Sequence, residues 1–364
     1  DEEPLTGRRR SSRKARGIRR LRNFFDEYSL GTEVMPSFHR GMKVLNAIHR
    51  NTGTEVVIKV RVKKESFRTW DEEDEWRCST EFMLGLNSCS NIARLYEVLE
   101  DDTAYYVIME KVSGQDLFES IAGQALPPVD EVKEIISQVL VGLVELHTSG
   151  RVHRDLKLEN IMLDRTPRPS RASSRKATAH QEEVLSPRSP VSVKLIDFDT
   201  VEEWAPETPK RRRDVLGTDQ YIAQEAYDGN YSPASDVFAV GVIAYRLLTG
   251  KFPFKADMFD DKPGENWVGS PKMKEIRNKL RSFKIKFEGY SVFEQDQVAC
   301  DLLRGMLAVN EQDRPSAAQA LAHPWLAGAP TSAAFRQRSM TRAATSPATS
   351  PTATSAEGRR SRKL

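Results

Sequence analysis

The sequence of 364 residues contains only three cysteines, Cys78, Cys89 and Cys300. Their spacing fits neither a disulfide framework nor a zinc site, and this is typical of a reducing compartment. The sequence also lacks an apolar run long enough to cross a bilayer, because the longest one, residues 237–248, is interrupted by a glycine and an arginine. We therefore expect an intracellular protein, cytoplasmic or nuclear, without a membrane span. The first residue is Asp1 rather than Met, which indicates a fragment whose preceding segment is missing.

Positive charge is concentrated in three segments. The formal net charge is +3, but residues 1–20 carry a net +5, residues 165–190 a net +4 and residues 328–364 a net +6, which leaves about −12 for the rest. Such basic segments usually stay solvated, so nucleic-acid binding is the less favoured alternative. The remaining body, with 39% hydrophobic and 29% charged residues overall, is typical of a soluble globular protein.

Low-complexity composition predicts disorder in the same three regions, with loose docking as the alternative for residues 1–30. Residues 1–30 are basic, residues 165–190 are rich in Ser, Pro and Arg, and residues 328–364 are rich in Ala, Thr, Ser and Pro. The middle segment offers phosphoacceptors in a basic context or before proline, namely Ser174, Thr178, Ser186 and Ser189. No stretch fits the calcium-binding EF-hand loop pattern.

One stretch, residues 152–164 (VHRDLKLENIMLD), concentrates the chemistry of phosphoryl transfer. That reaction needs a carboxylate to receive a hydroxyl proton, a cation near the transferred phosphoryl group and an amide oxygen for Mg²⁺. Asp155, Lys157 and Asn160 supply these in that order. The stretch resembles the catalytic loop of protein kinases, H-R-D-L-x-x-x-N, and a lysine two residues after the aspartate is the pattern of Ser/Thr kinases.

Other motifs of this family follow in the expected order. The run 55–60 (EVVIKV) resembles the strand V-A-I-K, which implies that Lys59 contacts the α- and β-phosphates of ATP. Its expected partner is a glutamate on a helix over residues 66–85. We favour Glu81, although an ungapped register places Thr80 there.

The resemblance also implies an adenine pocket. Met109 is the expected gatekeeper, the backbone of Glu110 and Val112 is expected to bind adenine, and Asp116 is expected to meet the ribose, with a helix cap as its alternative role. Three apolar residues are expected to cover adenine from above and below: Val44, Val57 and Met162.

Two family motifs are altered. Asp197 begins Asp-Phe-Asp where the family has D-F-G, so Asp197 is expected to bind Mg²⁺ with Asn160, and Asp199 is expected to make the segment switch state less freely. The glycine-rich loop lacks its glycines, since Ser37, His39 and Met42 stand in their places, which suggests weaker or altered nucleotide binding.

The activation segment ends in residues 217–225 (GTDQYIAQE), which resemble G-T-x-x-Y-x-A-P-E. Asp214 stands where many kinases carry a phosphorylated Thr, and it is predicted to pair with Arg154 without modification. The basic residues 210–213 are competing partners for it. Thr208, before a proline, is a candidate phosphosite.

The resemblance covers residues 35–327 and predicts an α+β, bilobal protein kinase fold. Residues 31–110 are expected to form a β-rich N-lobe with one main helix, and residues 111–327 a mostly helical C-lobe. The chain resembles the calcium/calmodulin-dependent and calcium-dependent group. This implies Mg²⁺- and ATP-dependent phosphorylation of Ser or Thr on protein substrates, with a preference for Arg near the acceptor through Glu159 and Asp116. The alternative is a pseudokinase that acts as a scaffold or allosteric regulator.

Overall fold

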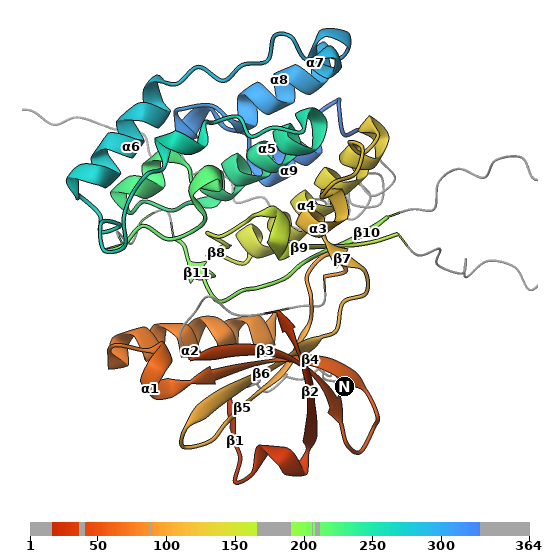
Figure 1. Ribbon diagram of the computed structural model, residues 1–364, viewed down its shortest axis with the longest axis vertical. Coiled ribbons are helices and arrows are strands. Elements are labelled where there is room, and N and C mark those ends of the chain that lie inside the picture. The colour runs from red at the N-terminus through yellow and green to blue at the C-terminus, as the bar shows by residue number, and fades with distance from the viewer. Residues whose placement is uncertain are drawn as a thin grey trace, which may run out of the picture.

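The computed structural model describes residues 17–35, 41–86, 89–165, 191–205, 207 and 212–327. These residues form two lobes, one built on a sheet and the other mostly helical (Figure 1). The α+β, two-lobed architecture agrees with the prediction.

The small lobe contains a six-stranded sheet among the described residues, in the order β1-β5-β6-β4-β3-β2. Only the β1–β5 pair is parallel. The strands are β1 (Arg19–Arg20), β2 (Tyr28–Met35), β3 (Met42–His49), β4 (Glu55–Val62), β5 (Leu95–Glu100) and β6 (Ala104–Glu110). A short 3-10 helix, η1 (Phe24–Asp26), precedes β2.

Strand β4 illustrates how the sequence sets the two faces of this sheet. Successive side chains of a strand point to opposite faces. Val56 and Ile58 are buried in one apolar cluster of the lobe, so Val57, Lys59 and Arg61 lie on the other face. This alternation turns Lys59 toward the second lobe rather than into the sheet core.

One long helix, α2 (Trp70–Gly85), covers part of the sheet, and a single turn, α1 (Lys63–Ser66), leads into it. Thr69 caps α2 by accepting a hydrogen bond from the backbone N–H of Glu72, and acidic residues fill the first turn. Both features stabilise a helix N-terminus. The side chains of Trp76, Met83 and Leu84 are buried and hold the helix in place.

The predicted disorder of residues 1–30 is wrong for residues 17–30. Residues 19–20 form β1, and Phe24 is buried with its ring stacked on Tyr106 at a centroid distance of 4.1 Å. The charge density of the segment concealed these apolar side chains. Residues 1–16 lie outside the described residues.

The large lobe is organised around α4 (Val129–Thr148) and α5 (Pro233–Thr249). Seven apolar residues of α4 recur at helical spacing and are fully buried: Val132, Ile135, Ile136, Val139, Leu140, Leu143 and Leu146. The other helices are α3 (Leu117–Ile121), α6 (Pro271–Ser282), α7 (Ser291–Gln295), α8 (Gln297–Met306) and α9 (Ala317–Leu321). The 3-10 turns are η2 (Leu158–Asn160), η3 (Asp219–Tyr221), η4 (Gln224–Asp228), η5 (Ala256–Met258) and η6 (Glu311–Asp313).

Two small sheets line the side of the large lobe that faces the small lobe (Figure 1). One has the order β10-β9-β7, and the other pairs β11 with β8. Their strands are β7 (Gln115–Asp116), β8 (Arg151–Val152), β9 (Ile161–Asp164), β10 (Ser192–Leu195) and β11 (Glu202–Glu203). Because β9 and β10 are antiparallel neighbours, the predicted insertion 165–190 joins adjacent strand ends.

Two ranges lie outside the described residues: residues 166–190, which contain the four predicted phosphoacceptors of the insertion, and the tail, residues 328–364. Among the helices that are described, none is both long and apolar enough to span a bilayer.

A buried ion pair fastens the end of the large lobe. The fully buried guanidinium of Arg314 donates to both carboxylate oxygens of Glu225, at 2.7 and 2.9 Å, and to the carbonyl of Ala308 at 2.9 Å. Charges taken out of water are tolerated only with such partners.

We predict that Arg314→Ala lowers the free energy of unfolding by about 3–5 kcal/mol, because it leaves the carboxylate of Glu225 without its cation. Urea denaturation measures this. Lys279→Ala, which removes a surface pair with Glu275, is the control and should change the urea midpoint far less. Equal midpoints for the two variants would contradict the assignment.

Candidate active site

The catalytic loop brings the side chains of Lys157 and Asn160 close to Asp155. The Oδ2 atom of Asp155 lies 3.0 Å from Nζ of Lys157, and Nδ2 of Asn160 donates to the backbone carbonyl of Asp155 at 2.8 Å. The buried side chains of Leu156 and Leu158 anchor the loop between them. Sequence reasoning therefore grouped Asp155, Lys157 and Asn160 correctly.

A fourth residue, Thr218, joins this cluster from the activation segment. Its hydroxyl donates to Oδ1 of Asp155 at 3.0 Å and lies 3.1 Å from Nζ of Lys157. Thr218 was not among the predicted site residues, although its place in the G-T-x-x-Y pattern was the available signal. Thr218 thus holds the activation segment directly against the carboxylate of Asp155.

Asp236, on α5, fixes the backbone of the catalytic loop. This buried carboxylate accepts hydrogen bonds from the backbone N–H groups of His153 and Arg154, at 2.8 and 2.9 Å, and contacts Nε2 of His147 at 2.9 Å. Burial favours its neutral form, but the contact with His147 and the backbone donors outweigh burial and lower the pKa of Asp236. The bonds support a strained position, since Arg154 has a φ of 71°.

Across the cleft, Lys59 is paired with two carboxylates. Its Nζ lies 2.7 Å from Oδ1 of Asp197 and 2.9 Å from Oδ2 of Asp199. Burial disfavours the ammonium, but the two carboxylates outweigh it and raise the pKa of Lys59. Burial also favours neutral Asp197, yet the nearby charge of Lys59 lowers the pKa of Asp197 to about 2. Both groups are therefore ionised at neutral pH.

The predicted partner of Lys59, Glu81, is wrong. Glu81 lies on the exposed side of α2, where its Oε1 accepts a hydrogen bond from the backbone of Ile18 at 3.4 Å. The α2 residue that is buried at this level is Thr80. The helix turns its glutamates elsewhere because its inner face is occupied by apolar residues and Thr80.

The predicted adenine pocket has a consistent upper wall. In the antiparallel sheet Val44 is paired with Lys59, and Val57 is paired with Met109. Directly paired residues share a face of the sheet, so Val44, Val57 and Met109 line the same face as Lys59. Met162, on β9 of the large lobe, is partly exposed and paired with Asp116.

The segment between the lobes is held in place by local contacts. The carboxylate of Glu110 accepts from Nζ of Lys194 at 2.8 Å, and its backbone N–H donates to the carbonyl of Arg94 at 2.9 Å. Val112 is partly exposed. Gly114 packs so closely that a Cβ on it would lie 2.1 Å from the carbonyl oxygen of Leu163. Only glycine fits at this position.

Asp116 caps α3, since its Oδ1 accepts a hydrogen bond from the backbone of Glu119 at 2.8 Å. Of the two roles left open by the sequence, the cap is therefore formed. One carboxylate oxygen is engaged in it.

The predicted pair between Arg154 and Asp214 is also wrong. Arg154 Nη1 lies 2.6 Å from Oε2 of Glu202, a buried residue of β11. Asp214 is exposed, and its backbone forms a bridge with Trp267. Thr208, the candidate phosphosite, lies outside the described residues.

Glu202, rather than Asp214, is therefore the carboxylate partner of Arg154, and Arg212 from the activation segment pairs with the same carboxylate. The guanidinium of Arg212 bonds both carboxylate oxygens of Glu202 and reaches Glu75 on α2, at 2.7 Å from Nη1. Glu202 is thus shared by two arginines, one from the catalytic loop and one from the activation segment. The contact with Glu75 links this group to the small lobe.

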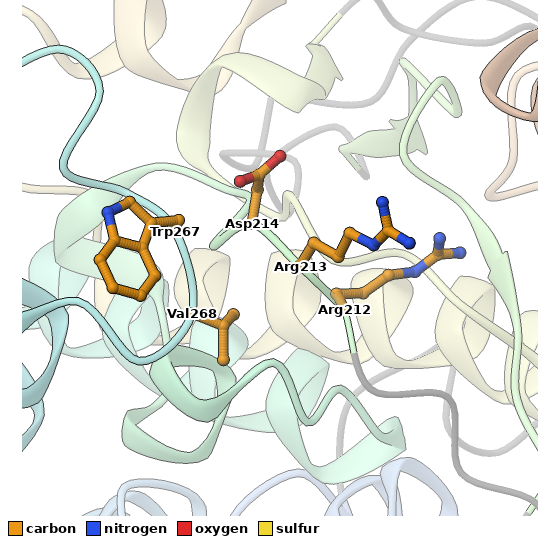
Figure 2. A pocket seen from close by; sticks show the side chains of 5 residues that line it. All are labelled: Arg212, Arg213, Asp214, Trp267 and Val268. Atoms are coloured by element: carbon orange, nitrogen blue, oxygen red, sulfur yellow. The ribbon is translucent and has the colours of Figure 1, made fainter. Parts of the chain in front are cut away.

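A hollow of about 530 Å³ lies beside this group, and Figure 2 shows Asp214 between the Trp267 ring and the two arginine side chains. Its lining residues are Arg212, Arg213, Asp214, Trp267 and Val268. It borders the activation segment rather than the Lys59 cleft.

Comparison with known sequences agrees with this geometry. The protein kinase domain profile matches residues 40–326. The chain belongs to the protein kinase family. Among its relatives are calcium-dependent protein kinase 4 of Plasmodium berghei, 31% identical over 83% of this chain, and CDPK-related kinase 1 of Arabidopsis thaliana, 28% identical over 76% of it. DNA damage response protein kinase DUN1 of Saccharomyces cerevisiae is 27% identical over 83% of this chain.

The matches cover 50%, 42% and 56% of those three relatives. The chain therefore spans about half the length of the curated relatives it matches.

The residues of this kinase fit the Mg²⁺ ion that its family uses. The side-chain N–H₂ of Asn160 points to Asp155, which turns its amide oxygen away from that carboxylate. Asp197 is ionised and keeps a second carboxylate oxygen beyond the one bonded to Lys59. A carboxylate oxygen and an amide oxygen suit Mg²⁺. Among the described residues no cluster of three or more His, Cys, Asp or Glu forms another metal site.

We predict that Glu202→Gln destabilises this kinase by about 3 kcal/mol, because the guanidinium groups of Arg154 and Arg212 lose the charge that they share. Urea denaturation measures the loss, and limited proteolysis should cut faster within the activation segment. Asp214→Asn is the matched control and should stay within about 0.5 kcal/mol of the parent protein. A larger loss of stability in Asp214→Asn than in Glu202→Gln would show that Asp214, and not Glu202, holds the activation segment in place.

Proposed function

We propose that this chain transfers the γ-phosphoryl group of ATP to serine or threonine hydroxyls of protein substrates. The observation that carries the proposal is the contact of Asp155 with both Lys157 and Thr218 in the large lobe, together with the ion pair that Lys59 of the small lobe makes with Asp197. Each residue has a role that phosphoryl transfer requires.

Asp155 is the group that orients the acceptor hydroxyl and receives its proton. Its side chain is 15% exposed, so a substrate hydroxyl can reach it. The ammonium of Lys157 holds the carboxylate in place and adds positive charge where negative charge develops on the transferred group. Thr218 keeps the activation segment, along which the substrate would lie, at a fixed distance from Asp155.

Three further polar residues would bind the nucleotide and its metal ion. Lys59 would bind the α- and β-phosphates, while Asn160 and Asp197 would hold Mg²⁺. When bound, ATP supplies the phosphoryl group, and Mg²⁺ supplies positive charge that offsets the negative charge of the phosphates. The apolar face formed by Val44, Val57 and Met109 would cover adenine.

We extend the proposal to a preference for arginine near the acceptor residue. Its support is Glu159, next to Asn160 in the catalytic loop, whose Oε2 atom is buried and has no hydrogen-bond partner among the described residues. An unpaired carboxylate oxygen favours an incoming guanidinium. Asp116 is less suited to this second role because it caps α3.

We place the protein inside the cell, in the cytoplasm or nucleus. The three cysteines are unpaired, and Cys78 is exposed. A free exposed thiol is better tolerated in a reducing compartment, where ATP is also available.

The test is transfer of labelled γ-phosphate from ATP with Mg²⁺ to a Ser/Thr peptide with arginines before the acceptor. Asp155→Asn should lower kcat by at least about 100-fold, since it removes the proton acceptor. The same peptide with alanine for arginine should show a higher KM.

Incorporation into the peptide that is equal in the Asp155→Asn variant would contradict the proposal. No turnover on several peptides, together with a rise in melting temperature on adding ATP, would instead favour a pseudokinase scaffold.

A further inference from the structure

In this chain Lys59 pairs with a carboxylate from the segment after β10 of the large lobe, and not with one from α2. The family pattern provides it from the long helix of the small lobe, but here the second carboxylate on Lys59 belongs to Asp199, at 2.9 Å. Asp199 stands where the Asp-Phe-Gly motif has glycine. The carboxylate that replaces the motif glycine therefore contacts Nζ of Lys59, the same atom that the helix glutamate was expected to contact.

The helix α2 offers no substitute among its buried residues. These are Trp76, Thr80, Met83 and Leu84, none of which carries a charge. Glu81 is exposed and bonded to the backbone of Ile18. A lysine whose side chain is only 7% exposed needs a carboxylate that stays with it.

Asp197 alone does not meet this need during the reaction. It already contacts Lys59, but it is also the carboxylate that fits Mg²⁺ together with Asn160. Once Asp197 turns to a metal ion, Asp199 is the acidic side chain that remains on Lys59. Its backbone does not resist this role, because the described non-glycine residues with positive φ are Arg154 and Asp197.

A second cation lies close to Asp199. Nη1 of Arg61 is 3.9 Å from Oδ2 of Asp199, and its guanidinium packs on the rings of Phe67 and Trp76, at 4.4 and 5.1 Å from their centroids. Two of its nitrogen atoms are buried without a hydrogen-bond partner among the described residues. Asp199 thus lies close to two cations on the same face of β4, the buried Lys59 and the partly buried Arg61.

We propose that Asp199 is the positioning residue that holds Lys59 toward the nucleotide phosphates, in place of a glutamate on α2. This proposal rests on the proposed kinase function. It converts the altered Asp-Phe-Asp motif from a sign of lost activity into a compensating feature. Glu81 then has no part in nucleotide binding.

The test compares Asp199→Asn, which keeps the shape and removes the charge, with the matched control Glu81→Gln. In steady-state kinetics Asp199→Asn should raise the KM for ATP about tenfold and leave the KM for peptide unchanged, because a charge-assisted bond to Lys59 is lost. Glu81→Gln should leave both constants unchanged. Restoring a helix carboxylate, in Thr80→Glu combined with Asp199→Gly, should recover most of the ATP affinity.

A readout without catalysis uses the nucleotide-free protein. Trinitrobenzenesulfonate reacts with neutral amines, so labelling of Lys59, quantified by peptide mass spectrometry, should rise about tenfold at fixed pH in Asp199→Asn if one opposing charge is removed. Glu81→Gln should not change it. This arm reports on Lys59 even if the parent protein transfers no phosphate, which would count against the proposed function and not against this inference.

Three results would overturn the inference. Higher kcat/KM in Asp199→Asn would make Asp199 a brake on the enzyme. An equal loss in Glu81→Gln would return the role to α2. Unchanged labelling of Lys59 in a folded Asp199→Asn protein, checked by thermal melting, would show that Asp199 does not hold the lysine. If the Thr80→Glu combination fails to fold, the Asp199→Asn arms still decide.

Discussion

The buried ammonium of Lys59 is the constraint on which the cleft depends. It sits on the sheet of the small lobe, yet both of its carboxylates, Asp197 and Asp199, belong to the segment that follows β10 in the large lobe. An unpaired ammonium in this position would cost several kcal/mol. These ion pairs therefore join the two lobes beside the apolar face of β3, β4 and β6. This is the face that is proposed to cover the nucleotide.

Three other carboxylates, all in the large lobe, are likewise paired with donors from distant parts of the sequence. Asp236 accepts the backbone of the catalytic loop, Glu202 holds Arg154 and Arg212, and Glu225 holds Arg314. Each is mostly buried and collects donors from segments far apart in the sequence. Because the low polarity of the interior makes an unsatisfied member costly, these contacts specify one loop arrangement. In this way Glu202 joins the activation segment, through Arg212, to Arg154 of the catalytic loop.

Much of the fold was predictable because its signals are local. The catalytic-loop motif identified Asp155, Lys157 and Asn160 within a few residues of one another, and the run 55–60 identified the strand that carries Lys59. The core of the small lobe was partly missed, since Phe24 lies in a segment dominated by arginines.

The two failed pairing predictions, for Lys59 and for Arg154, both concern which of several carboxylates contacts a given cation. Glu81 and Asp199 were both present in the sequence, as were Asp214 and Glu202. Motif position favoured the first of each pair, whereas burial and backbone direction favoured the second. Thr80 faces inward because the turn of α2 that contains Trp76 and Met83 sets the phase of the helix. Such choices depend on three-dimensional packing and leave little trace in a single sequence.

The most direct measurement of the central claim is a crystal structure of this chain with Mg²⁺ and a non-hydrolysable ATP analogue. The account predicts that Nζ of Lys59 contacts the phosphates while a carboxylate oxygen of Asp199 stays within about 3 Å of it, and that Asp197 and Asn160 hold the metal ion. An ion pair between Lys59 and Glu81, with Asp199 turned away into solvent, would contradict it.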